Sequence, residues 1–153
     1  MTKQLVIYTD GAARGNPGPG GYGVVLQWGT TMKELSQGFR MTTNNRMELM
    51  AVIAGLQTLT RTGLDVVIYS DSSYVVNSVE KGWVFNWVKT GFKDKKNADL
   101  WKQYLQVHSK HKIKFVWVKG HADNKWNNRC DELATAAADS RNWLVDEGYE
   151  RGL

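Results

Sequence analysis

The sequence predicts an α/β fold in which a mixed sheet is flanked by helices, and two features of the chain carry this prediction. Three strand-like apolar segments come first, at residues 4–9, 22–28 and 32–41, separated by short turns. Helical and strand-like patterns then alternate, which is typical of parallel αβ units. A chain of 153 residues fits one domain, because two independent cores would each be small. We therefore expect a single domain over residues 1–153.

Turn signals bound the first three strands. Residues 4–9 form a continuous apolar and aromatic run, typical of a central strand, which ends at Asp10-Gly11. Residues 15–23 are dense in glycine and contain both prolines, which predicts a structured turn. Gly29-Thr30-Thr31 predicts a hairpin turn between the second strand and the third.

Apolar residues at helical spacing predict a helix that begins near residue 44, where Asn44 or Asn45 can cap it. The remaining strands are expected at residues 66–69 and 113–118, and the remaining helices at residues 74–81, 83–90, 98–110 and 127–140. Residues 142–153 are weakly patterned, so we expect a loose tail there.

Basic side chains are concentrated in one part of the chain, which points to an anionic partner. The net charge is +5, and residues 81–119 contain ten lysines against two aspartates. Clustered lysines neutralise phosphates and release counterions, so this region is a candidate nucleic-acid surface. Trp83 and Trp87 lie between the lysines and can stack on sugars or bases. Because they are four positions apart on one helix face, a small satellite core is an equal alternative.

The composition also excludes several classes of protein. A single cysteine, Cys130, excludes an internal disulfide framework and a multi-cysteine zinc site. No apolar run approaches the roughly 20 residues that span a bilayer, and the first residues lack the plan of a signal peptide. We therefore expect a cytoplasmic location and no membrane association. No long apolar heptad is visible, so we also expect a monomer.

Gly18, Gly20 and Gly23 match the spacing of a dinucleotide-binding fingerprint, but the context argues against that function. The fingerprint needs a helix N-terminus directly after the glycines, where the pyrophosphate binds. Here residues 24–26 are apolar and two of them are the β-branched valine, which predicts a strand. We interpret the glycines as a turn that allows close backbone approach.

Four acidic residues occupy positions that suit a metal site. Asp10 and Asp71 each follow an apolar strand, while Glu48 and Asp131 lie among apolar residues in predicted helices. Each alone is more often a turn or cap residue. If they converge at one edge of the sheet, their oxygens suit Mg²⁺ or Mn²⁺ rather than zinc. Two such ions can stabilise the attacking and leaving oxygens of a phosphoryl displacement.

Six short blocks of the chain together resemble one family. They are TDG at residues 9–11, GNPGPGGYG at 15–23, TTNNRMEL at 42–49, DS at 71–72, VKGH at 118–121 and NRCDEL at 128–133. In this order they resemble ribonuclease H type 1, the bacterial ribonuclease HI form, across nearly the whole chain. The resemblance implies a five-stranded mixed sheet of the ribonuclease H-like fold. It also implies an endonuclease that hydrolyses the RNA strand of RNA–DNA hybrids with little sequence specificity.

The resemblance implies roles for particular residues in this reaction. Asp10, Glu48, Asp71 and Asp131 match the family's metal-binding carboxylates, which hold two Mg²⁺ ions (Mn²⁺ as a substitute) with substrate bound. His121 matches a histidine that assists proton transfer or product departure, and its ordinary pKa suits this work. The implied products carry 5′-phosphate and 3′-hydroxyl ends.

The resemblance also implies a substrate-binding set. Asn16 and Asn45, with backbone groups around Gly11 and Ala13, match residues that contact the RNA minor groove, where the 2′-hydroxyl distinguishes RNA from DNA. Contacts to the DNA strand are implied for the phosphate-binding residues Thr43 and Asn97 and for the basic protrusion of Trp83, Trp87, Lys89, Lys95 and Lys96. This likeness favours binding over a satellite core for the two tryptophans.

The sequence departs from the family at two substrate contacts. Ser73 stands where well-studied members often carry a glutamine, and Gln27 stands where a basic residue is common. Two other functions remain as alternatives: a hybrid-binding module without catalysis, and an integrase-like DNA endonuclease. The four carboxylates argue against the first, and the short chain and the RNA-contact asparagines argue against the second.

Overall fold

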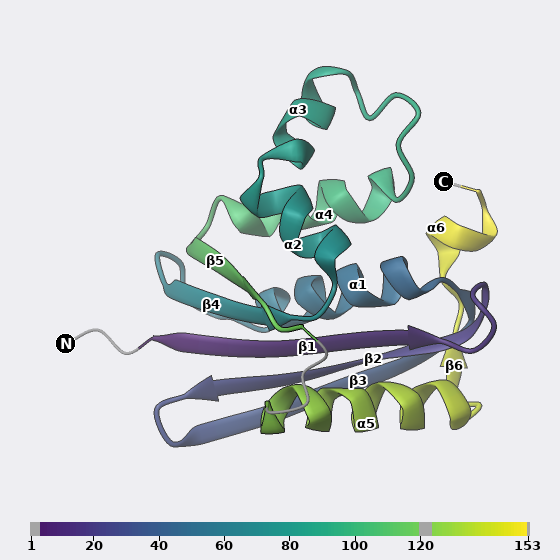
Figure 1. Ribbon diagram of the computed structural model, residues 1–153, viewed down its shortest axis with the longest axis horizontal. Coiled ribbons are helices and arrows are strands. Elements are labelled where there is room, and N and C mark those ends of the chain that lie inside the picture. Colours follow the sequence, from purple (N-terminus) through teal and green to yellow (C-terminus); the bar gives the residue numbers. More distant parts are fainter. Residues whose placement is uncertain (1–3, 120–123, 153) are drawn as a thin grey trace.

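The computed structural model describes residues 4–119 and 124–152, and it contains one sheet with helices on both faces (Figure 1). The strands are β1 (Leu5–Ala13), β2 (Gly18–Trp28), β3 (Thr31–Thr42), β4 (Asp65–Ser70), β5 (Lys112–Trp117) and β6 (Trp143–Leu144). The helices are α1 (Asn44–Gln57), α2 (Ser73–Glu80), α3 (Trp83–Lys89), α4 (Ala98–His108), α5 (Lys125–Asp139) and α6 (Glu147–Glu150). The α/β class and the order of elements from β1 to α5 agree with the sequence prediction, which contained neither β6 nor α6.

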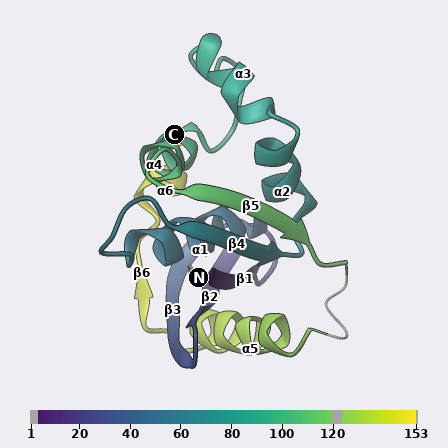
Figure 2. The same cartoon turned by 90° about the vertical axis from the view of Figure 1, so that its left-hand side faces the viewer.

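The sheet has the order β5-β4-β1-β2-β3-β6 and is mixed, as predicted. β2 is antiparallel to both β1 and β3, whereas β4 is parallel to β1 and β5 is parallel to β4. α5 covers one face, against β1, β2 and β3, while α1 covers the opposite face with α4 packed on it (Figure 2). The strand count is six rather than five, because the short β6 adds to the edge at β3.

Gly18, Gly20 and Gly23 lie within β2, so the turn predicted over residues 15–23 is shorter than expected and the strand begins at Gly18. The cap of α1 differs from the prediction. Thr43 caps this helix, with its Oγ1 accepting a hydrogen bond from the Arg46 N–H (3.3 Å). The Asn44 side chain instead accepts from the Ala13 N–H (2.7 Å) and so joins the start of α1 to the end of β1.

Residues 142–153, which we expected to be a loose tail, contain the short strand β6 and the short helix α6. The anchor is Asp146, whose side chain is 2% exposed and accepts hydrogen bonds from Arg46 Nε (2.8 Å) and Thr42 Oγ1 (2.6 Å). Arg46 also pairs with Asp99 of α4 (2.7 Å). The prediction was wrong because the tail's partners lie about 100 residues earlier in the chain, where no local pattern indicates them.

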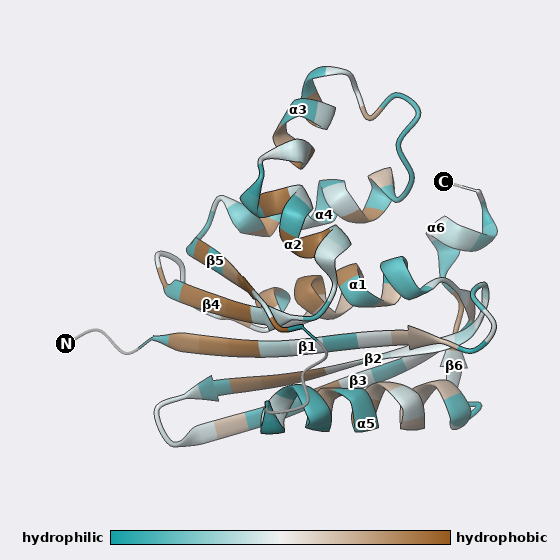
Figure 3. Ribbon diagram, in the orientation of Figure 1, coloured by the Kyte–Doolittle hydropathy of each residue, from teal (hydrophilic) through white to brown (hydrophobic). Residues whose placement is uncertain are grey.

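The main core lies between the sheet and the layer of α1, α2 and α4. Its fully buried members include Ile7, Leu49, Ile68 and Trp101. Figure 3 shows the hydrophobic residues concentrated along the strands, while the loop after α3 is mostly hydrophilic. This core holds β1, β4 and α1 together, which are the elements that carry Asp10, Asp71 and Glu48.

α5 lies directly on the backbone of the sheet, because glycines face it. A Cβ atom added at Gly21, Gly23 or Gly38 would collide with backbone atoms of α5, including the Cys130 carbonyl oxygen at Gly23. The absence of side chains at these positions therefore sets the distance between α5 and the sheet. It also sets the position of Asp131, which follows Cys130.

We expect Gly23→Ala to destabilise the protein by about 1–3 kcal/mol, since the added methyl group forces α5 away from the sheet. Urea unfolding measures the change as a lower midpoint with an unaltered slope. Glu132→Ala, on the exposed side of the same helix, is the matched control and should leave the midpoint in place. An unchanged midpoint for Gly23→Ala would contradict the close contact.

The ion pair of Asp146 predicts a dependence of stability on pH. Burial alone raises the pKa of Asp146, but hydrogen bonds from Arg46 and Thr42 outweigh it, so the pKa lies below its ordinary value. The pair's contribution is therefore fully present above the unfolded pKa of about 3.9 and is lost as pH falls through the folded pKa.

Asp146→Asn should lower the free energy of unfolding by about 3 kcal/mol at pH 7, because a buried ion pair is broken while Asp99 remains. The difference from the wild type should shrink below pH 4, measured by urea unfolding across the pH range. Asp139→Asn, which breaks an exposed pair with Arg14, should show little change at any pH. A constant difference down to pH 2 would show that the charge of Asp146 is not its source.

Candidate active site

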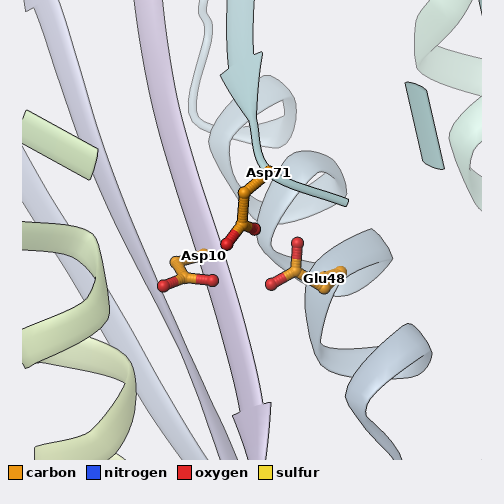
Figure 4. A group of neighbouring side chains, drawn as sticks. All are labelled: Asp10, Glu48 and Asp71. Carbon is orange, nitrogen blue, oxygen red and sulfur yellow. The ribbon is translucent and has the colours of Figure 1, made fainter. Parts of the chain in front are cut away.

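Three carboxylates from separate parts of the chain meet at one place in the fold. Asp10 lies in β1, Glu48 in α1 and Asp71 directly after β4, and Figure 4 shows their side chains turned toward one another. One oxygen of each lies within 4.8 Å of an oxygen of the other two. Asp10 and Glu48 are buried, with 5% and 6% of their surface exposed, and Asp71 is half-buried. The predicted convergence is thus confirmed for these three residues.

The position of Asp10 differs in one respect from the sequence interpretation. It does not end its strand, because β1 continues to Ala13 in antiparallel pairing with β2. The parallel pairing with β4 stops earlier, at Tyr8 opposite Tyr69. Asp10 therefore lies beside the end of β4, where Asp71 follows. The apolar run in the sequence ended where the parallel pairing ends rather than where the strand ends.

Gly11 joins Asp10 to Glu48. Its N–H lies 2.8 Å from Asp10 Oδ1 and 2.6 Å from Glu48 Oε1, so one donor serves both carboxylates. A Cβ atom at Gly11 would collide with the backbone of Met47 and Glu48. The start of α1 can approach β1 this closely only because residue 11 is glycine, and this approach brings Glu48 beside Asp10.

The negative charges of the three carboxylates lie close together, and a bound cation would stabilise them. Burial raises the pKa of Glu48 well above its ordinary value, and hydrogen bonding with Asp10 and repulsion from Asp10 and Asp71 raise it further. The Gly11 N–H opposes this only in part. Glu48 Oε2 is buried and has no hydrogen-bond partner among the described residues. A cluster of oxygen donors with one unsatisfied oxygen fits a hard divalent cation such as Mg²⁺ or Mn²⁺.

Asp131 is placed apart from this group. It lies on α5 with an exposed side chain, and it does not belong to the set whose oxygens lie within 4.8 Å of one another. The structure thus brings together three of the four predicted carboxylates. His121, the predicted proton-transfer residue, lies outside the described residues.

Several of the predicted substrate contacts surround one cavity of about 590 Å³. Its lining includes Asn16, Thr43, Asn45, Lys96 and Asn97, which come from three distant parts of the chain. The Asn16 side chain is held in place by accepting a hydrogen bond from the Asn44 N–H (2.9 Å). The cavity carries amides, a hydroxyl and a cation, which suits a phosphate and its neighbouring sugars. Ser73 begins α2 and is exposed.

The sequence left two roles open for Trp83 and Trp87, namely nucleic-acid binding and packing in a small core, and the structure assigns a different one to each. Trp83 is 42% exposed, with Lys81 Nζ 5.5 Å from its ring centroid. Trp87 packs edge-on against the buried Trp101 (6.0 Å between centroids), and Lys95 Nζ lies 5.3 Å from its ring. Trp87 thus anchors the protrusion to the core, while Trp83 is available at the surface. Lys89, Lys95 and Lys96 are exposed beside them.

Two buried polar residues near the site escaped the sequence analysis. Arg46, two positions before Glu48, links α1 to Asp99 and Asp146 by ion pairs. Asn127, at the start of α5, donates to backbone carbonyls of β1 and β4. Both lie in or beside the motif blocks, in which other residues were identified as functional. Their hydrogen-bond partners are distant in sequence, so no local pattern indicated that Arg46 and Asn127 are buried and paired.

Comparisons with known proteins agree with this geometry. The family model of RNase H matches residues 2–139 of the chain. A Ribonuclease H of Syntrophus aciditrophicus is 53% identical over 152 residues, covering 96% of this chain and 87% of the relative.

Solved structures show the same likeness. That of LC9-RNase H1, described as a type 1 RNase H with the type 2 active-site motif, aligns with a TM-score of 0.81 at 31% identity, over 99% of this chain and 81% of the other. LC11-RNase H1 in complex with an RNA/DNA hybrid aligns with a TM-score of 0.64 at 28% identity, over 89% and 97% of the two chains. In residues 4–119 and 124–152, no helix combines the length and the apolar character needed to cross a membrane.

The contact at Gly11 predicts a specific effect on metal binding. Gly11→Ala should push α1 from β1, separate Glu48 from Asp10, and weaken binding of Mg²⁺ or Mn²⁺ by about 10–100-fold in calorimetric titration. Gly55→Ala, which crowds Ile7 and Val24 at the other end of α1, is the matched control and should retain the wild-type affinity. Equal affinities for Gly11→Ala and the wild type would contradict this account of the site.

Proposed function

The chain belongs to the RNase H family, and we propose that it hydrolyses the RNA strand of RNA–DNA hybrids at the carboxylate cluster of Asp10, Glu48 and Asp71. The observation that carries this proposal is the approach of three acidic oxygens within 4.8 Å in a family of metal-dependent nucleases. The neighbouring cavity and the basic protrusion supply surfaces for a nucleic acid.

We assign two divalent ions, Mg²⁺ with Mn²⁺ as a substitute, to the active state with substrate bound. Asp10 would be a ligand of both ions, Glu48 and Asp71 would complete one site, and Asp131 would complete the other. When bound, the ions activate the attacking water and stabilise the charge on the scissile phosphate. The exposed position of Asp131 on α5 suits a ligand of the ion that arrives with the substrate.

The chain's own residues hold this arrangement before the reaction. The Gly11 N–H orients Asp10 and Glu48. His121 assists proton transfer or product departure, and the departing 3′-oxygen gains a proton, so that the products carry 5′-phosphate and 3′-hydroxyl ends. Because the carboxylates are placed by buried backbone contacts, little rearrangement accompanies ion binding.

Substrate recognition divides between the two strands of the hybrid. Asn16 and Asn45, with backbone groups of Gly11 and Ala13, contact the RNA minor groove and read the 2′-hydroxyl, and Ser73 supplies a shorter contact than glutamine would. The DNA strand is held by Thr43, Asn97, Trp83, Lys89, Lys95 and Lys96, while Trp87 supports the protrusion from the core. Most of these contacts are to sugar and phosphate, so cleavage has little sequence specificity.

The cytoplasmic location and the monomeric state stay predictions. Gel filtration tests the monomeric state.

The test is cleavage of a panel of substrates by the wild type and Asp10→Asn, with Mg²⁺ and with chelator. The wild type should cleave the RNA of a hybrid and leave duplex DNA and single-stranded RNA intact. Substitution of a group that only orients a metal ligand typically lowers metal affinity or activity by about 10–100-fold. Asp10→Asn changes a proposed ligand itself, so it should lower the rate by more than about 100-fold. Asp139→Asn, whose partner is the exposed Arg14, is the charge-matched control.

Three outcomes separate the hypotheses. Undiminished cleavage by Asp10→Asn would refute the metal assignment. Cleavage of duplex DNA at a similar rate would favour an integrase-like endonuclease, and tight hybrid binding without turnover in either metal would indicate a binding module.

A further inference from the structure

Asn127 makes an unusual set of contacts beside the carboxylate cluster. It lies in the first turn of α5, and its side chain is completely buried. Its Nδ2 group lies 3.3 Å from the Thr9 carbonyl oxygen and 3.2 Å from the Tyr69 carbonyl oxygen. One amide thus donates to both of the central parallel strands. Neither contact is required by the helix, whose cap is the Asn124 side chain.

These two carbonyls belong to residues that lie one and two positions before acidic residues. Thr9 precedes Asp10, and Tyr69 lies two positions before Asp71. The register of β1 and β4 ends at Tyr8 opposite Tyr69, so the two aspartates lie just beyond the last paired residues. Backbone hydrogen bonds between β1 and β4 therefore end just before Asp10 and Asp71, and they do not fix the distance between these two carboxylates. The Asn127 amide, with the Thr9 hydroxyl that also reaches the Tyr69 carbonyl (3.3 Å), connects the strands at this point.

The same residue connects the third element. Asn127 and Asp131 are four positions apart on α5, so they share a face of the helix, one turn apart. Fixing Asn127 to the carbonyls of Thr9 and Tyr69 therefore fixes where Asp131 lies relative to the two strands. A single amide links the segments that carry Asp10, Asp71 and Asp131.

Asn127 is not needed to attach α5 to the sheet. Further along the helix, the backbone of α5 lies on glycines of β2 and β3, and Cys130, Ala134 and Ala138 are buried there. The Asn127 Oδ1 atom is buried without a hydrogen-bond partner among the described residues. An apolar side chain would avoid this cost if packing were the only requirement, so the two donors of the amide are the feature that explains an asparagine here.

We propose that Asn127 is a positioning residue that fixes the separation of Asp10, Asp71 and α5 and so prepares the metal centre for its ions. This inference rests on the proposed function of the carboxylates. Mutual repulsion drives the acidic side chains apart before a cation binds, and a tie between the strands resists that separation. The amide suits this work because it offers two N–H donors in one plane to two carbonyl oxygens.

The test measures Mg²⁺ and Mn²⁺ binding to the free protein by calorimetry, together with kcat and KM for a hybrid substrate. Asn127→Asp keeps the shape and removes both donors, and Asn127→Ser, which adds no charge, provides the same test should Asn127→Asp not fold. Metal affinity should fall about 10–100-fold and kcat should fall with it, while KM for the hybrid stays within about twofold. KM is preserved because the cavity around Thr43 and Asn97 is untouched.

Trp143→Phe is the matched structural control. It removes the Trp143 Nε1 hydrogen bond to the Ala138 carbonyl (2.8 Å) at the other end of α5, so it loosens the same helix away from the carboxylates. It should lower stability and leave metal affinity unchanged. If the Asn127 variants behave like Trp143→Phe, with lower stability but wild-type metal affinity and kcat, the positioning role is wrong.

Asp10→Asn separates this inference from the function on which it rests. Loss of metal binding in Asp10→Asn with wild-type binding in the Asn127 variants would overturn only the positioning role. Retention of metal binding and of hybrid cleavage in Asp10→Asn would overturn the proposed function itself.

Discussion

Mutual repulsion among Asp10, Glu48 and Asp71 is the constraint around which the rest of the site is built. Three acidic oxygens within 4.8 Å raise the energy of the folded chain unless a cation or a proton compensates them. Burial, and after it the interaction with Asp10 and Asp71, raises the pKa of Glu48 well above its ordinary value. Backbone contacts hold the carboxylates together despite this repulsion. The Gly11 N–H donates to Asp10 and Glu48, and the absence of a side chain at Gly11 allows α1 to approach β1. The protein thereby keeps, in its folded state, a site that a divalent ion stabilises.

The surroundings of the cluster are held from several directions. Arg46 ties the start of α1 to α4 and to the C-terminal segment through Asp99 and Asp146, so the helix that carries Glu48 is fixed at its other side. Glycines of β2 and β3 seat α5 against the sheet. These contacts stabilise the fold and place acidic residues at the same time. Substitutions here therefore affect stability and metal binding together, and matched controls are needed to separate the two.

The two surfaces proposed for substrate binding differ in character. The cavity lined by Asn16, Thr43 and Asn97 is polar and formed by loops and helix ends that the core holds in place. The protrusion of α3 is attached through Trp87, which packs on Trp101, and it presents Trp83 and lysines at the surface. An aromatic and basic protrusion suits a nucleic-acid backbone, whereas the amides and the hydroxyl of the cavity suit groups with a defined hydrogen-bonding geometry, such as a phosphate or a sugar hydroxyl.

The sequence by itself determined the α/β class, the order of the elements, the family resemblance and the three acidic residues that meet, because apolar periodicity and short motifs are local in the chain. Only the tertiary structure decided the strand that Asp146 helps to anchor, the continuation of β1 past Asp10, the exposed position of Asp131 apart from the cluster, and the division of roles between Trp83 and Trp87. It alone also showed the buried contacts of Arg46 and Asn127. Each of these depends on partners far away in sequence, and such contacts arise from packing and hydrogen bonding between elements, which no local pattern encodes.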